Sequence, residues 1–345
     1  MAPSTTSAPV GRRKTDRAAG PGQPGPSRGL SERRWQGLSR ALSGRRRQGR
    51  SRAPSDRRRQ GLAAWLFALP FLLVFGFFML VPLVSSFLMS FTDFRATDVQ
   101  SPFGVNFVGL SQYAELFGDA QFRKAMFNTA LVVVVGIPLT MAVALALAMA
   151  LNSGITRFRA AYRVGFYTPV VTSIVAVAVV WRFILQPDGL FNTLLGWVGI
   201  TGPDWLHSTT WALPSLIGMT AWRNMGTLMV IFLAGLQNVP PELHEAAIVD
   251  GAGAWQRFRR ITVPLLRPTL LLGAILLSVA YLQFFEESFV MTQGGPLNST
   301  LSVSYFTYNQ FGFGKYGYAS AASYVLFTVI AALSVIQFRL LRPKD

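Results

Sequence analysis

The 345-residue sequence contains no cysteine and only two histidines, His207 and His244, which lie far apart in the chain. Disulfide bonds, thiolate metal sites and a cysteine nucleophile are therefore excluded, and two distant histidines do not by themselves make a metal site. A G-x-x-x-x-G-K-S/T phosphate loop is also absent, so the chain is not predicted to hydrolyse ATP. We expect no catalytic residue, no metal and no cofactor, and predict that the protein is not an enzyme.

Charged residues are scarce as well, at 14% of the chain, whereas 51% of the residues are apolar. The net charge of +17 is unevenly distributed, because residues 1–61 hold sixteen Lys or Arg and three acidic residues and so carry +13. This segment is rich in Pro, Gly, Ser and Arg and cannot bury enough apolar surface to fold alone. We therefore predict a disordered, Arg-rich cytoplasmic tail over residues 1–61.

The basic tail contains a short repeat, in which two or three arginines shortly before Gln-Gly recur every twelve residues, at 33–37, 45–49 and 57–61. The charge favours a role in keeping the N-terminus cytoplasmic, by the positive-inside rule. An alternative is binding to anionic membrane lipid, since each basic residue near such a surface contributes about 1 kcal/mol. Nucleic-acid binding is disfavoured, because no recognised binding module accompanies the charge.

Six apolar segments are long enough to cross a hydrocarbon core of about 30 Å, which requires roughly 20 helical residues. We therefore predict an all-α polytopic membrane protein with six transmembrane helices. The expected division is a first helix with an extracytoplasmic segment over 62–124, followed by a five-helix core over 125–340. The predicted spans lie near residues 62–90, 126–151, 161–184, 211–235, 267–291 and 318–340.

The distribution of Lys and Arg between the connecting loops predicts the orientation of these spans. With the tail left out, ten of them lie on the side of the N-terminus and four on the opposite side. Both termini are therefore expected in the cytoplasm, together with the loop 238–264 between the fourth and fifth spans.

That loop carries the most informative pattern of the chain, over Glu242–Pro268. Pro240 and Pro241 suit the first turn of a helix, and Gly251 and Gly253 permit a turn with positive φ. The pattern predicts a short helix, a glycine break and a second short helix that leads into the next span.

The same loop resembles the permease signature of bacterial ATP-binding-cassette importers, which reads Glu-Ala-Ala, three residues, Gly, nine residues, Ile, one residue, Leu-Pro. Val263 replaces the leucine of this signature. Residues 107–129, 181–192, 232–237 and 291–319 resemble carbohydrate permeases of the maltose/glycerol-phosphate type, and specifically the larger partner of the permease pair. The loop positions that match the signature are Glu245, Ala246, Ala247, Gly251, Ile261 and Pro264.

The resemblance implies a type I importer permease fold in the inner membrane of a bacterium, forming half of a carbohydrate pathway. The implied partners are a second permease subunit in a heterodimer, a pair of cytoplasmic ATP-binding subunits and an extracytoplasmic sugar-binding protein. The residues implied to couple to the ATPase are the six matched positions and Asp250. The alternative, a secondary transporter driven by an ion gradient, predicts inverted repeats and acidic residues near the midplane, and neither is evident in the sequence.

Polar and aromatic residues within the spans are candidates for the substrate pathway, because burying an ionisable group in a membrane is costly. Arg182 lies near a span end, where anchoring by snorkelling is favoured. Adjacent helical residues point about 100° apart, so only one of Glu286 and Glu287 can face a given cavity. These two carboxylates could form hydrogen bonds to sugar hydroxyl groups, form a salt bridge to an arginine, or be solvated at the mouth of the pathway. The candidates are Trp181, Trp222, Arg223, Asn224, Tyr281, Gln283, Glu286 and Glu287.

Overall fold

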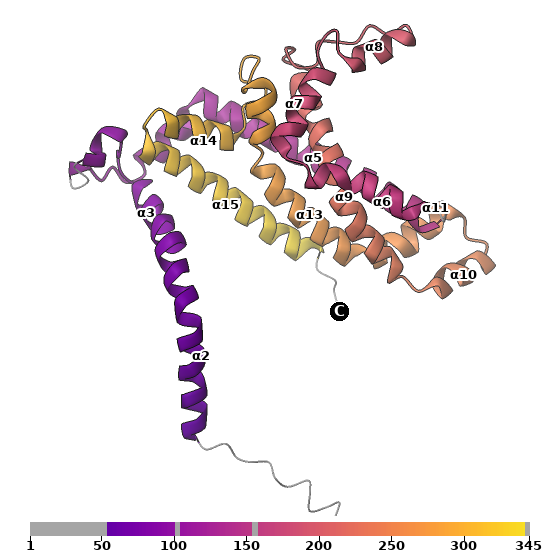
Figure 1. Ribbon diagram of the computed structural model, residues 1–345, viewed down its shortest axis with the longest axis horizontal. Coiled ribbons are helices and arrows are strands. Elements are labelled where there is room, and N and C mark those ends of the chain that lie inside the picture. The colour runs from indigo at the N-terminus through magenta and orange to yellow at the C-terminus, as the bar shows by residue number, and fades with distance from the viewer. Residues whose placement is uncertain (1–53, 101–103, 154–157, 342–345) are drawn as a thin grey trace, which may run out of the picture. The chain divides into compact units, whose positions relative to one another are not determined.

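The apolar runs form helices, as their lengths predict. The computed structural model describes residues 54–100, 104–153 and 158–341, and Figure 1 shows the course of the helices. Two further pairs of helices are each long and apolar enough to cross a membrane when taken together, although each pair is bent at a short break. With each bent pair counted as one span, the described residues contain up to six spans, which agrees with the predicted number. Four single helices are long and apolar enough to cross a membrane: Trp65–Met89, Ala120–Asn152, Ala212–Gln237 and Tyr316–Arg339.

The first helix begins earlier than the sequence predicts. Helix α2, Pro54–Phe75, continues through a π-helical turn, Gly76–Leu80, into α3, Val81–Met89. Residues 54–61, predicted as the end of the disordered tail, are therefore helical, because extending an existing helix adds one hydrogen bond per residue fixed. The rest of the predicted tail lies outside the described residues. The chain divides into two units between Leu73 and Val74, and the sites described below lie in the second unit.

The third apolar segment, predicted as one span over 161–184, is a broken helix. Helices α6, Arg159–Val171, and α7, Ile174–Ile184, meet at an angle of 100°. Thr172 and Ser173 separate them, with ψ angles of 144° and 128° that no α-helix contains. The Thr172 hydroxyl donates to the carbonyl of Thr168 at 2.9 Å and so provides a partner in the last turn of α6, where helix carbonyls otherwise lack one.

The fifth apolar segment is shorter than the predicted span over 267–291. Helix α13 runs only from Arg267 to Leu282, with Gln283 as its C-cap residue, and a separate π-helical turn, Ser288–Thr292, follows. At its other end α13 meets the helical segment Ala254–Leu265 at 70°. Pro268 in the first turn of α13 suits this bend, because proline lacks the N–H that would continue the preceding helix.

Helix α9, Ala212–Gln237, forms the centre of the second unit, where it packs against α6, α13 and the long helix α5, Ala120–Ser153. More than half of its residues are buried, including Thr220 and Gly226. A helix that is apolar nearly all round is expected in such a position. Helix α15, Tyr316–Leu341, packs against α13 and against the short helix α14, Val303–Gly312.

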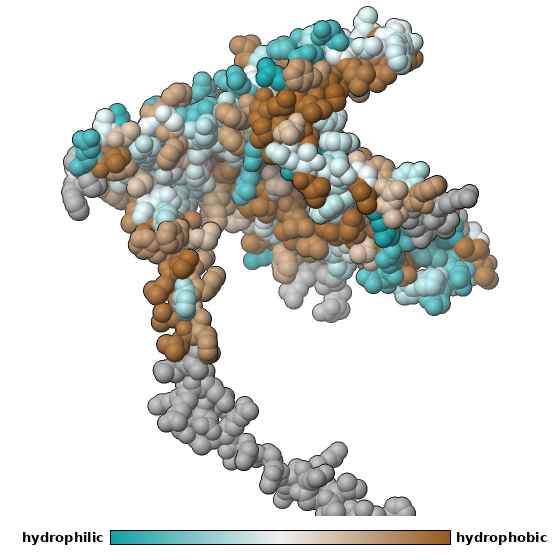
Figure 2. All heavy atoms as spheres, in the orientation of Figure 1, coloured by the Kyte–Doolittle hydropathy of each residue, from teal (hydrophilic) through white to brown (hydrophobic). Residues whose placement is uncertain are grey.

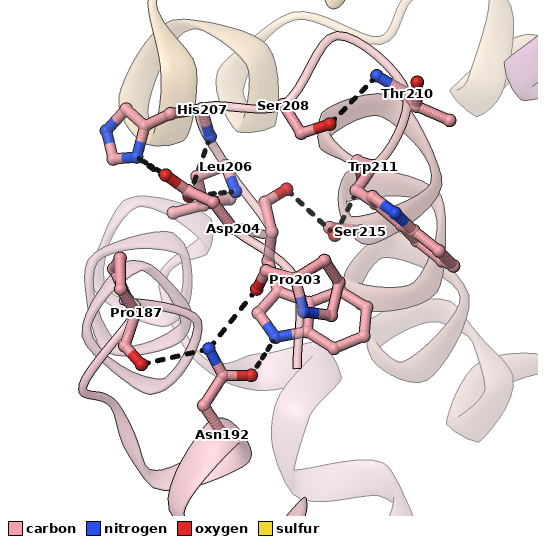
Figure 3. Close-up of polar contacts among 11 residues, drawn as sticks. Pro187, Asn192, Pro203, Asp204, Leu206, His207, Ser208, Thr210, Trp211 and Ser215 are labelled. Atoms are coloured by element: carbon pink, nitrogen blue, oxygen red, sulfur yellow. Dashed lines mark hydrogen bonds and ion pairs between the residues drawn. The ribbon is translucent and has the colours of Figure 1, made fainter. Parts of the chain in front are cut away.

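The segment between α7 and α9 contains the short helix α8, Leu190–Trp197, and is held together by one asparagine (Figure 3). The Asn192 side-chain amide donates to the carbonyls of Pro187 and Pro203 at 3.0 and 3.3 Å. Its Oδ1 accepts a hydrogen bond from Trp205 Nε1 at 2.7 Å. One side chain therefore connects both ends of the segment to α8.

Asp204 forms the turn that leads from this segment towards α9. Its Oδ1 accepts a hydrogen bond from the backbone N–H of His207 at 3.1 Å and lies 3.0 Å from Nδ1 of the same residue. Burial alone raises the pKa of Asp204, but these interactions outweigh it and hold the pKa below its ordinary value. Because the folded-state pKa is lowered, the contribution of this turn to stability is present at neutral pH and is lost as the pH falls through that pKa.

Candidate functional site

The loop between α9 and α13 begins with helix α10, Pro241–Val249. Pro240 is the N-cap residue, with a ψ of 127°, and Pro241 occupies the first helical position, where its missing N–H costs nothing. Glu242 lies in the first turn, where its charge complements the positive end of the helix dipole. The predicted start of this short helix is therefore confirmed.

Helix α10 ends at a glycine whose backbone is left-handed. Gly251 has φ of +78°, and its N–H donates to the carbonyl of Ile248 at 3.0 Å. The N–H of Ala252 donates to the carbonyl of Ala247 at 2.8 Å. These two bonds are those of a Schellman motif, which requires a positive φ at the glycine position. The predicted glycine break is confirmed, and a second short helix, α11, Ala254–Arg257, follows it.

No side chain of α10 is buried, although the helix carries several apolar residues. Val249 is 88% exposed, Ile248 55% and Leu243 44%, and Trp255 of α11 is 70% exposed. Figure 2 shows that hydrophilic residues surround this part of the chain, with apolar atoms at its outer edge. Apolar side chains gathered on an exposed short helix indicate a surface that another protein covers.

The residues predicted to couple to an ATPase fall into two groups. Glu245, Ala246 and Asp250 are exposed, and Ala247 is partly exposed beside them. Ile261 and Pro264 instead lie half-buried in the π-helical turn Phe258–Thr262 and in α12, Val263–Leu265. The first group thus belongs to the exposed helix and the second to the connection with α13. Four exposed apolar residues of this loop were not predicted to take part, although apolar side chains in a loop between two spans were the available signal: Leu243, Ile248, Val249 and Trp255.

A buried polar cluster lies between α9 and the turn after α13. Glu287 is 4% exposed, and the Thr220 hydroxyl lies 3.4 Å from its Oε1. The Asn224 side-chain amide donates to the carbonyl of Thr220 at 2.9 Å. Arg223 places a positive charge in electrostatic range of Glu287, and its buried Nε has no hydrogen-bond partner among the described residues. Three of the predicted pathway residues, Arg223, Asn224 and Glu287, are therefore brought together, and Thr220 was missed.

Tyr281 extends this cluster towards α5. Its hydroxyl lies 2.6 Å from Oγ1 of Thr140, which itself donates to the carbonyl of Gly136 at 2.7 Å, so the Tyr281 hydroxyl donates to Thr140. A Cβ atom at Gly136 would overlap the Tyr281 ring. The absence of a side chain at Gly136 therefore allows the ring to lie against α5. Sequence reasoning found Tyr281 but not its partners, which come from a helix more than a hundred residues away.

The predicted residues Trp181 and Trp222 face one another across α7 and α9, with ring centroids 5.5 Å apart. They line a cavity of about 540 Å³ whose walls are apolar except for Thr168 and Thr172. This cavity offers ring faces and very few hydrogen-bonding groups, so it differs in chemistry from the buried cluster.

The other predicted pathway residues lie elsewhere. Gln283 lines a separate cavity of about 270 Å³ beside α14 and α15, and Glu286 is exposed. The burial of Glu287 and the exposure of Glu286 agree with the expectation that only one of the two faces a given cavity. Arg182 is exposed in the last turn of α7, in agreement with an anchoring position. Within the residues that the structure describes, no group of three acidic or histidine side chains is placed to hold a metal ion.

Comparison with known proteins gives consistent results. Residues 142–344 match the family described as binding-protein-dependent transport system inner membrane component. The chain is 34% identical to the lactose transport system permease protein LacF of Rhizobium radiobacter, over 81% of this chain and 94% of LacF. It is also 34% identical to the arabinooligosaccharides transport system permease protein AraP of Bacillus subtilis, over 81% and 88% of the two chains.

A solved structure has the same arrangement of helices. A chain of a bacterial ABC transporter involved in the import of the acidic polysaccharide alginate superposes with a TM-score of 0.68 at 25% identity. The match covers 84% of this chain and 97% of the other. The fold is thus that of an importer permease.

The protein therefore belongs to the family of binding-protein-dependent transport system inner membrane components. It is a multi-pass subunit of the inner membrane and is non-catalytic, as members of this family are. The expectation of an ABC-importer permease is confirmed, and the alternative of an ion-driven secondary transporter is not supported.

Proposed function

We propose that this chain forms half of the translocation pathway of a carbohydrate importer, in a heterodimer with a second permease subunit. It is the larger partner of that pair. A pair of cytoplasmic ATP-binding subunits powers the importer, and an extracytoplasmic binding protein delivers the sugar. The excess of Lys and Arg on the side of the N-terminus supports cytoplasmic placement of both termini and of α10.

The exposed surface of α10 is the observation that carries the proposal. Glu245, Ala246 and Asp250 are exposed beside Ile248 and Val249, and none of them packs into the core of this chain. In the proposed assembly this surface occupies a groove of an ATP-binding subunit. Movement of that subunit is then transmitted through α12 to α13, which carries Tyr281 at its opposite end.

The proposed substrate class is carbohydrate. Relatives at 34% identity are permeases for lactose and for arabinooligosaccharides. The buried cluster around Thr220, Asn224, Tyr281 and Glu287 provides hydroxyl, amide and carboxylate groups that match the hydroxyl groups of a sugar. Buried polar groups are costly inside a membrane, and where they occur they commonly mark a functional site. Lactose is the first sugar to test.

Co-purification and uptake together test this function. The chain is expressed with the second permease subunit, the ATP-binding subunit and the binding protein; capture of the ATP-binding subunit is measured by co-purification, and lactose uptake is measured in proteoliposomes. Glu245→Arg places the opposite charge on the exposed face of α10, so we expect loss of both ATPase capture and uptake. Capture that persists in Glu245→Arg would contradict the coupling assignment.

Glu287→Gln is expected to reduce sugar uptake by about 10- to 100-fold while the complex still assembles. The change removes a charged hydrogen-bond acceptor, which is worth about 1.5–3 kcal/mol, and every 1.4 kcal/mol is a factor of ten. Glu286→Gln is the comparison variant, because its side chain is exposed, and a much smaller effect is expected. Initial rates of uptake in proteoliposomes provide the measurement. Equal losses in both variants would show that burial of Glu287 is irrelevant to transport.

A further inference from the structure

A groove lies between α5 and the start of α9, and its lining includes no residue of the buried polar cluster. Its volume is about 450 Å³, within the range of about 300–1,000 Å³ that ligand pockets commonly have. Leu213 and Ile217 of α9 line it and are only 6% and 5% exposed, so the core of the chain holds this wall in place. We call this feature the α5–α9 groove.

The α5 wall of the groove is an apolar stripe. Phe127 is 58% exposed, Val135 48% and Leu139 41%. The described part of the chain therefore leaves much of the stripe uncovered, although it belongs to a helix apolar enough to cross a membrane. The residues of the stripe recur every fourth position and so share one face of the helix: Phe127, Leu131, Val135 and Leu139.

The polar residues of the groove are gathered at one end. Asn128 Nδ2 donates to the carbonyl of Asn298 at 2.8 Å, which places the next residue, Ser299, beside the beginning of α5. Thr209 and Thr210 immediately precede α9, which packs along α5. The polar lining residues are Lys124, Asn128, Thr209, Thr210 and Ser299.

Lys124 is the one charged side chain among the described residues that line the groove. Its Nζ lies 5.8 Å from the centre of the Phe127 ring, and it forms no salt bridge within the part of the chain that the structure describes. The acidic residue nearest in sequence, Asp119, is occupied elsewhere. Its Oδ1 accepts a hydrogen bond from the N–H of Gln121 at 2.7 Å, and its Oδ2 accepts one from the Tyr318 hydroxyl at 3.1 Å. The charge of Lys124 is therefore available to an anion from outside the chain.

The length of the groove corresponds to one leaflet of a bilayer. Lys124 and Leu139 are fifteen residues apart, which is about 22 Å along a helix at 1.5 Å per residue. A bilayer with its headgroup regions is about 40–45 Å thick, so one leaflet measures about 20–22 Å. A membrane helix of another subunit would cross both leaflets, whereas a lipid molecule occupies one.

We propose that the α5–α9 groove binds one anionic phospholipid. An acyl chain lies along the apolar stripe of α5, and the phosphate group lies at Lys124, since a lysine ammonium group binds phosphate as a point charge. The hydroxyl groups of Thr209 and Thr210 are donors for the remaining headgroup oxygens. A zwitterionic lipid offers the same phosphate but also carries a cation, which Lys124 repels. This inference goes beyond the carbohydrate function, because it requires only that α5 lies in the membrane.

Photo-crosslinking tests the site on the complete complex in nanodiscs. The probe is phosphatidylglycerol with a diazirine in one acyl chain, and mass spectrometry locates its adducts. We expect adducts on residues 127–139 of the wild-type chain. Lys124→Gln should reduce them about fivefold, equivalent to about 1 kcal/mol at 1.4 kcal/mol per factor of ten, and Lys124→Arg should retain them. Val135→Trp fills the apolar part of the groove and should reduce the adducts at least as much.

Lys315→Gln is the matched control. Lys315 lies just before α15, and its Nζ is 5.9 Å from the centre of the Tyr318 ring, so its setting resembles that of Lys124. It does not line the α5–α9 groove. Labelling of residues 127–139 should therefore equal that of the wild type.

Competition identifies the ligand class. Excess unlabelled phosphatidylglycerol should remove the adducts, whereas phosphatidylcholine should compete at least fivefold less well and glycerol phosphate not at all. Equal competition by phosphatidylcholine would overturn the proposal, as would labelling that is unchanged in Lys124→Gln. Competition by glycerol phosphate would make the site one for free phosphate esters. Absence of adducts from residues 127–139 of the wild-type chain would show that another occupant, such as the second permease subunit, covers the groove. None of these results depends on sugar transport, so a failure of the carbohydrate function is measured separately.

Discussion

Gly251→Ala is expected to weaken capture of the ATP-binding subunit about 5- to 30-fold and to reduce uptake in proportion. Gly251 ends α10 with φ of +78°, a region in which a Cβ atom costs roughly 1–2 kcal/mol. No atom lies within 4 Å of the position where that Cβ would be, so the cost comes from the backbone alone. Alanine therefore favours a different turn in which the hydrogen bonds to the carbonyls of Ile248 and Ala247 are lost, and the C-terminal end of α10 is no longer held in one position.

Gly253→Ala is the matched control for this prediction. Gly253 also has open space around its Cβ position, but its φ of −66° and ψ of 163° suit any residue. The same substitution two residues away should therefore leave capture within about twofold of the wild type. Affinity for the ATP-binding subunit, measured by titration of purified components, is the direct measurement. Equal effects at both positions would mean that the left-handed turn does not set the position of α10.

Gly226→Ala is expected to destabilise the chain by about 1–3 kcal/mol, the usual cost of forcing extra volume into a packed contact. At Gly226 the backbone of α9 approaches that of α6 so closely that an added Cβ would overlap the carbonyl of Phe166. The obstructing atoms belong to backbone, so no side-chain rotation relieves the overlap. One helix has to move, and with it the wall of the cavity beside Trp222.

Gly218→Ala separates this steric effect from the general benefit of removing a helical glycine. Gly218 lies in the same helix and has nothing within 4 Å of its Cβ position. Alanine there should be neutral or stabilising by up to about 1 kcal/mol. Thermal unfolding in detergent, followed by size-exclusion fluorescence, should show a fall in Tm for Gly226→Ala and none for Gly218→Ala. A shared response would remove the close approach of α6 and α9 as the cause.

Hydrophobic length was enough to predict the number and approximate position of the membrane helices, because a span has to match the thickness of the bilayer. The interruptions were not predictable in the same way. Thr172 and Ser173 break the third segment, yet both side chains are small and lie in an apolar run, where hydropathy does not detect them. The end of α13 at Leu282 is similarly hidden, since Phe284 and Phe285 continue the apolar pattern.

The two candidate sites differed in how far the sequence could predict them. The α10 loop is local, so spacing in the sequence identified Glu245 and Gly251 and predicted the left-handed turn. The buried cluster depends on contacts between distant helices, and Thr140 reaches Tyr281 only because Gly136 lets the two helices approach. Sequence spacing carries no information on such a contact. The sequence therefore identified the ionisable members of the cluster but not their partners. Gln283 was grouped with them, although it lies on the other side of α13.

The break between α6 and α7 constrains what can surround this chain in the membrane. Carbonyl groups at the end of α6 and N–H groups at the start of α7 lack the partners that a continuous helix would provide. The Thr172 hydroxyl satisfies one carbonyl, and hydrocarbon can satisfy none of the rest. Lipid tails therefore cannot coat this side of the bundle. Water or another polypeptide therefore has to reach the level of Ser173 if this segment lies within the bilayer.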